Sequence, residues 1–107
     1  MIGQYSRNAR RPAGIKNLVV LASDFHYLEA ARLTPVPGWM FHELIAGPLS
    51  ARHARPIPLD DALNPRSLFA RGGTNNFGLI SVDATGLTVR FVAEDGSTLF
   101  THTVAPR

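Results

Sequence analysis

The sequence predicts a strand-rich α/β (α+β) fold that ends in an antiparallel β-meander. The run Leu18–Ala22 is continuously apolar and partly β-branched, as in a strand covered on both faces within a parallel or mixed sheet. Three strand-like segments follow near the end of the chain, and the last turn between them contains Asp95-Gly96, a strong hairpin signal. The 107 residues are 45% hydrophobic and 18% charged, which is enough for one small domain with a core.

The first half of the chain is expected to hold two strands behind a terminal arm. Residues 1–14 are polar and Arg-rich, which predicts a flexible arm ahead of a single domain over residues 15–107. We expect strands over Asn17–Asp24 and Trp39–Ala46. Between them a short helical turn over Leu28–Leu33 would end at the prolines that follow.

The second half begins with a long segment of little periodicity. Leu49–Asn75 is rich in Pro and Gly, and we predict only one helical turn in it, near Asp60–Leu63. A segment of that length without regular structure usually wraps around something or lines a site. The meander then consists of the expected strands Phe77–Asp83, Leu87–Glu94 and Thr98–Val104.

Composition excludes several classes of function. There is no Cys, so disulfides, Cys-ligated zinc, iron–sulfur clusters and thiol catalysis are excluded. The longest apolar run is far too short to span a bilayer as a helix, and the formal net charge of +3 is too mild to indicate nucleic acid. We therefore expect neither a membrane nor a nucleic-acid partner. Ten of the eleven basic residues are Arg, which is compatible with a phosphate-bearing substrate.

The most suggestive candidate site is Asp24-Phe25-His26, directly after the first predicted strand. In an extended chain Asp24 and His26 would project from the same face, at the strand's carboxyl end. Open α/β sheets place their sites at that edge, and a carboxylate with an imidazole suits zinc, iron or manganese. The alternative is an Asp–His hydrogen bond that merely ends the strand.

The other polar candidates favour structural roles. His42 and Glu43 are adjacent in a predicted strand, so they point to opposite faces and cannot chelate one ion together. His102 alternates with threonines in the last strand and is expected at the surface or in a cross-strand pair. Asp60-Asp61 is expected to begin a helical turn as an N-cap, although a metal contact is an alternative.

Two further residues are weak candidates for substrate binding. His53 lies next to Arg52 in the irregular segment. The simpler interpretation is a solvated loop histidine, and contact with a substrate phosphate is the alternative. No Gly-x-Ser-x-Gly elbow and no glycine-rich phosphate loop is present, so the catalytic residues stay unassigned.

Several segments in the right order resemble alkaline phosphatase D-like (PhoD-like) metallophosphoesterases. Leu18–Tyr27 is similar to that family's "VVLTGDVHYA" segment, and Phe41–Ala51 to the "EFVGGPISA" strand and loop. Asn76–Asp83 and Leu87–Phe91 resemble the closing "NFGLVEVD…LTVEFRDADG" hairpin, and Asp95-Gly96 fits its turn. The resemblance runs from about residue 15 to the end of the chain.

The resemblance implies metal-dependent hydrolysis of phosphoric esters, with a phosphate ester as substrate and iron and calcium as metals. It implies that Asp24 and His26 match the family's late metal ligands, and that the chain is the C-terminal part of a metallophosphoesterase β-sandwich. Members of that family are often exported.

The chain also departs from the family. Its members are several times longer, and their other metal ligands and activating groups lie upstream of everything present here. Ser23 stands where the family usually has Gly. We therefore expect a truncated portion without the full active site, and a second chain or copy that covers the apolar strand Leu18–Ala22. The alternative is a small, non-catalytic, β-rich binding module.

Overall fold

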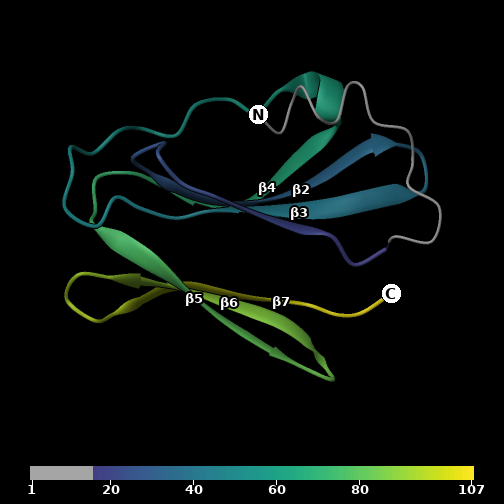
Figure 1. Ribbon diagram of the computed structural model, residues 1–107. Helices are drawn as coiled ribbons and strands as arrows, with labels where there is room; N and C mark the ends of the chain where they lie inside the picture. The colour runs from purple at the N-terminus through teal and green to yellow at the C-terminus, as the bar shows by residue number, and fades with distance from the viewer. Residues whose placement is uncertain (1–15) are drawn as a thin grey trace.

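A computed structural model describes residues 16–107, which form two β-sheets packed face to face (Figure 1). Within this part of the chain there are seven strands, one short 3-10 helix and no α-helix. The predicted arm over residues 1–14 lies outside the described residues. In chain order the elements are β1 (Val19–Ala22), β2 (Leu28–Val36), β3 (Trp39–Ile45), η1 (Asp61–Leu63), β4 (Pro65–Arg71), β5 (Asn76–Asp83), β6 (Gly86–Ala93) and β7 (Thr98–Val104).

The first sheet is mixed and has the strand order β1-β3-β2-β4. β1 pairs with β3 in parallel, with Val20 opposite Glu43, whereas β2 pairs antiparallel with both β3 and β4. The chain thus leaves β1, builds β2, and returns to place β3 between them. The carboxyl ends of β1 and β3 consequently meet at one edge of the sheet.

The second sheet is the predicted antiparallel meander, in the order β5-β6-β7. Phe91 at its centre lies opposite Gly78 of β5 and Phe100 of β7. The Asp95-Gly96 turn joins the last two strands, as the sequence predicts.

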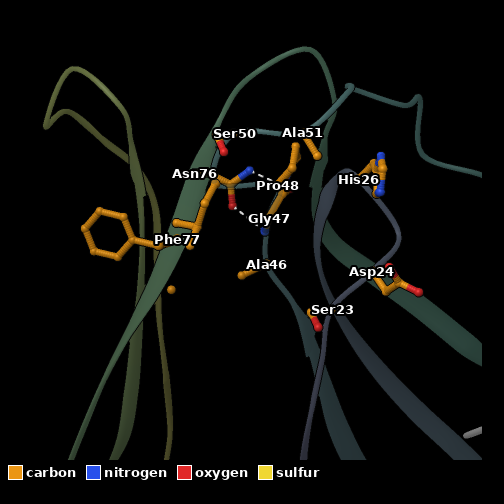
Figure 2. A pocket seen from close by; sticks show the side chains of 12 residues that line it. Ser23, Asp24, His26, Ala46, Gly47, Pro48, Ser50, Ala51, Asn76 and Phe77 are labelled. Atoms are coloured by element: carbon orange, nitrogen blue, oxygen red, sulfur yellow. Dashed lines mark hydrogen bonds between the residues drawn. The ribbon is translucent and has the colours of Figure 1, made fainter.

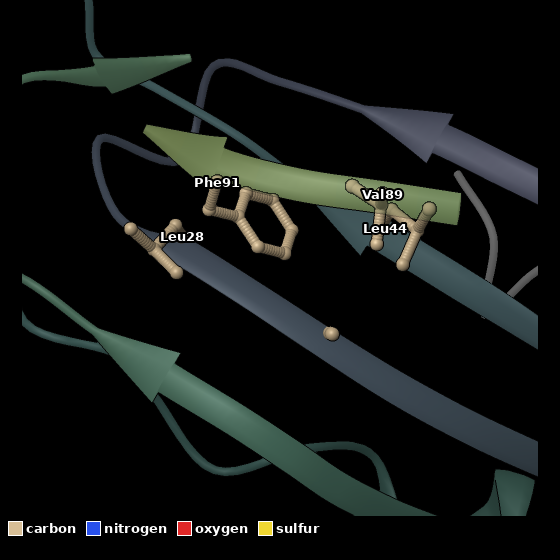
Figure 3. Close-up of a cluster of buried hydrophobic side chains, with 5 residues drawn as sticks. Leu28, Leu44, Val89 and Phe91 are labelled. Atoms are coloured by element: carbon tan, nitrogen blue, oxygen red, sulfur yellow. The ribbon is translucent and has the colours of Figure 1, made fainter. Parts of the chain in front are cut away.

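The main core lies between the two sheets (Figure 3). Leu28 and Leu44 from the first sheet pack against Val89 and Phe91 from the meander, and all four are almost completely buried. At the margin of the core the rings of Phe69 and Phe100 stack, with centroids 4.7 Å apart.

The opposite face of the four-stranded sheet is also covered. Leu33, Trp39 and Phe41 form a second buried cluster with Leu63 of η1. The irregular segment before η1 is tied to this side of the sheet, because the amide of Ala54 donates to the carbonyl of His26 (2.9 Å). The long segment therefore wraps the outer face of the sheet.

Three expectations about the fold are wrong. Leu28–Leu33 is not a helical turn but most of β2, so the described fold is all-β rather than α/β. Its Leu, Glu, Ala and Arg favour a helix, but pairing with strands on both sides overrides that preference. β4 lies inside the predicted irregular segment, and its Pro65 occupies the first position of a strand at the edge of the sheet, where a missing N–H is tolerated.

The third correction concerns Leu18–Ala22. The parallel pairing of this segment is confirmed, but β1 is an edge strand and not a central one. Leu21 is 62% exposed, so the strand is not covered on both faces within the described residues. No helix in residues 16–107 has the length and apolar character needed to cross a bilayer.

Candidate functional site

A pocket of about 480 Å³ opens where the parallel strands β1 and β3 end (Figure 2). The loop after β1 contributes Ser23, Asp24 and His26, the loop after β3 contributes residues 46–51, and the start of β5 contributes residues 76–78. We call it the Asp24–His26 pocket. Sites at the carboxyl ends of parallel strands are common because the loops there converge.

The backbone that presents Asp24 and His26 is bent and not extended. Both residues adopt left-handed conformations, with φ of 75° and 64°, which residues other than Gly seldom do. The assumption that the strand continues to Asp24 is therefore wrong, because β1 ends at Ala22. The two side chains nevertheless lie on the same side of the pocket in Figure 2, with the Asp24 carboxylate directed away from Gly47. Asp24 is exposed and His26 is half-buried.

Asn76 holds the opposite wall of the pocket. Its amide Nδ2 donates to the carbonyl of Gly47 (2.8 Å), and the amide of Gly47 donates to its Oδ1 (2.9 Å). Nδ2 also donates to the carbonyl of Thr74 (3.2 Å), and the amide of Asn76 donates to the carbonyl of Pro48 (2.8 Å). The Gly47-Pro48 peptide bond in this wall is cis. Asn76 is only 2% exposed, so this buried amide fixes the β3–β5 side of the pocket.

The sequence analysis missed this role of Asn76. An isolated Asn at the start of a strand adds nothing to a hydrophobic pattern, and its partner Gly47 is 29 residues away. Only the approach of the start of β5 to the loop after β3 in three dimensions reveals the pair.

Arg52 and His53 follow the pocket-lining residue Ala51 but do not line the pocket themselves. Both are exposed. The Nε2 of His53 lies 2.8 Å from Oδ1 of Asn75, and Asn75 donates through Nδ2 to Glu94 (2.8 Å). The described contacts of His53 therefore attach the loop to the meander, and phosphate contact stays a prediction.

The buried carboxyl groups of Glu29 and Glu43 lie outside the pocket. The sequence analysis did not single out Glu29. Ser67 donates to its Oε2 (2.7 Å), whereas Oε1 is buried without a hydrogen-bond partner within the described residues. Burial raises the pKa of Glu29, although the Ser67 hydrogen bond opposes this. Burial also raises the pKa of Glu43, and the negative charge of Glu29 raises it further. Glu29 escaped notice because its segment was expected to be helical.

The remaining polar candidates have structural contacts. Asp60 caps η1, since its Oδ1 accepts from the amide of Ala62 (3.0 Å), and the N-cap prediction is confirmed. His102 is half-buried in β7, and its ring centroid lies 5.5 Å from that of His42 in β3.

The described residues do not complete a metal site. Over residues 16–107 no three or more His, Asp or Glu side chains gather closely enough to hold an ion. Asp24 and His26 thus line one pocket without a third ligand. Comparisons with protein-family models, with curated proteins and with solved structures found no match to the chain.

Proposed function

We propose that the Asp24–His26 pocket is half of a metal and phosphate-ester site of a PhoD-like metallophosphoesterase. In this proposal the chain supplies two metal ligands, and another polypeptide supplies the rest. The observation that carries the proposal is the position of Asp24 and His26 in one pocket, at the carboxyl ends of the two parallel strands. The resemblance of Leu18–Tyr27 to that family supplies the reaction class.

The donor types fit the proposed metals. A carboxylate is a ligand for calcium, and a carboxylate with an imidazole suits iron. Both side chains sit on left-handed backbone, a costly conformation that concentrates at functional sites. A metal held there would polarise a phosphoryl oxygen and so assist hydrolysis of the ester. Ser23 and Ser50 in the same pocket are hydroxyl donors that could orient the phosphate.

The missing ligands require a partner, and β1 offers the place for it. Catalytic zinc sites generally use three protein ligands per ion, so two ligands can hold an ion weakly but do not complete a catalytic centre. Among residues 16–107, β1 is paired with β3 alone, and Leu21 in β1 is 62% exposed. An added strand from a second chain or copy would satisfy the open edge and bring its residues to the Asp24–His26 pocket.

The second candidate function is a non-catalytic, β-rich binding module. The specific observation in its favour is that the described residues supply no third metal ligand. Such a module would use the pocket for a ligand without any chemistry.

Metal content and hydrolysis test the proposal together. The purified full chain is equilibrated with Ca²⁺ or Fe²⁺, and bound metal is measured by mass spectrometry. We expect Asp24→Asn and His26→Gln each to lower metal affinity about tenfold or more. The matched variants Asp61→Asn and His102→Gln, outside the pocket, should retain it.

The outcomes separate the two candidates. Equal metal content in all four variants would remove Asp24 and His26 as ligands and leave the binding module. Metal loss confined to Asp24→Asn and His26→Gln supports the proposed half-site. Hydrolysis of a chromogenic phosphate ester, followed by the release of its coloured alcohol, then shows whether the chain is active without a partner.

A further inference from the structure

A second pocket, of about 260 Å³, lies at the opposite end of β1 and β3 from the Asp24–His26 pocket. It forms where the two sheets meet, and Leu18, Met40 and residues 103–106 supply its apolar and backbone wall. Five basic side chains from four separate parts of the chain converge on it, namely Lys16, Arg32, His42, His102 and Arg107. We call it the basic pocket.

His42 is the innermost of these groups. It is only 7% exposed, and its ring contacts that of His102 across the two sheets, with centroids 5.5 Å apart. Its imidazole makes no hydrogen bond within residues 16–107. Its ring nitrogens are not among the buried polar atoms that lack a partner, so they are available to a ligand that enters the pocket.

The ionisable side chains that line the basic pocket are all basic. None of the described residues that line the basic pocket is Asp or Glu. Arg32 from β2, Lys16 before β1 and Arg107 after β7 form no ion pair with any described residue. Burial lowers the pKa of His42, and the charges of His102, Arg32 and Arg107 lower it further. Like charges held together without counter-charges destabilise the fold and attract an anion.

We infer that the basic pocket binds a small oxyanion, either a phosphate or a carboxylate group. Arg guanidinium groups match the geometry of both, and Lys16 and the two imidazoles add further N–H donors. The pocket volume of about 260 Å³ lies below the usual range for drug-sized ligands, which favours inorganic phosphate or a compact carboxylate over a larger molecule. This inference does not rest on the proposed phosphoesterase function, because the two pockets share no residue.

The test is a titration of the metal-free full chain at constant ionic strength. Inorganic phosphate and acetate are added in separate arms, and the His42 ring is followed by NMR. The bound anion should raise the pKa of His42, because it favours the charged imidazole. Arg32→Gln should weaken binding about tenfold or more, whereas Arg90→Gln, exposed on β6 and outside the pocket, should not.

Each outcome decides the matter. Saturable binding in either arm supports the inference. Binding of phosphate alone identifies a phosphate site, binding of acetate alone a carboxylate site, and binding of both a site that accepts either oxyanion. If neither anion saturates, or if Arg32→Gln and Arg90→Gln bind equally well, the inference is wrong. Should Arg32→Gln fail to fold, Lys16→Gln at the exposed start of the described chain replaces it. Asp24→Asn should bind the anion as the unaltered chain does, which separates this result from the proposed metal site.

Discussion

Glu43 shows how individual buried residues set the pH response of the protein. It is 5% exposed in β3, and Glu29 on the neighbouring strand adds like charge to the same face. Burial raises its pKa, so the folded state binds protons more readily than the unfolded state does. The protonated carboxyl group of Glu43 therefore favours the folded state. This contribution to stability is fully present below the pKa of Glu43 in the unfolded chain, and it is lost as the pH rises through its pKa in the folded protein.

Removing this charge should stabilise the protein at neutral pH. We expect Glu43→Gln to raise the free energy of unfolding by about 1 kcal/mol at pH 7, because the amide is never charged. The gain should be smaller at pH 4, because the raised pKa leaves the folded carboxyl group of the unaltered chain largely protonated there. Urea denaturation at both pH values measures the difference.

The control is Asp61→Asn, which removes an exposed carboxylate from η1. It should bring no comparable gain at neutral pH. A gain from Glu43→Gln that is equally large at pH 4 and pH 7 would show that charge is not the cause.

The local sequence pattern predicts some of the strands and not others. β6 and β7 were predictable because an alternating pattern and an Asp-Gly turn are local signals. β2 was not, because its helix-favouring residues become a strand only through pairing with β3 and β4. The position of β1 at an edge likewise depends on which strands are absent beside it, and no local sequence pattern contains that information.

The two turns of the meander should respond differently to an added methyl group. Gly86 begins β6 with φ of 144°, and a Cβ there would collide with the backbone carbonyl of Val104. Gly96 has φ of 86°, but a Cβ there meets open space. We expect Gly86→Ala to cost about 2 kcal/mol or more and Gly96→Ala about 1 kcal/mol, as measured by thermal unfolding. Equal costs would show that the Val104 contact is relieved easily.

At the scale of the whole molecule, the two sheets are joined by the apolar core and by polar contacts. Among these are the hydrogen bonds between Asn76 and Gly47, which we call the clasp. The apolar core between the sheets follows from the hydrophobic pattern, since Leu44, Val89 and Phe91 lie in predicted strands. The hydrogen bonds between Asn76 and Gly47 do not follow from that pattern, because they need the start of β5 to meet the loop after β3. The candidate site was foreseen to the same extent: Asp24 and His26 were identified as candidates, whereas the wall opposite them was not.

Breaking the clasp should weaken the whole domain. Asn76→Ala removes three hydrogen bonds of a buried side chain and leaves the amide and carbonyl of Gly47 without their partner. We expect a loss of about 2–4 kcal/mol in the free energy of unfolding. Asn75→Ala, whose partners His53 and Glu94 are exposed, should cost under about 1 kcal/mol. Similar losses in the two variants would contradict the clasp.

The order β1-β3-β2-β4 also has a consequence for the growing polypeptide on the ribosome. The apolar segment Leu18–Ala22 leaves the ribosome before Trp39–Ile45, its neighbour in the sheet, and the sheet gains its opposing layer only after Thr98–Val104. In contrast, β6 pairs with β5 and β7 pairs with β6, so each strand pairs with the one that precedes it in the sequence. Such local contacts form rapidly. Before these strands have formed, Leu18–Ala22 is exposed and prone to aggregate. A chaperone that binds nascent hydrophobic segments should therefore act mainly during that interval.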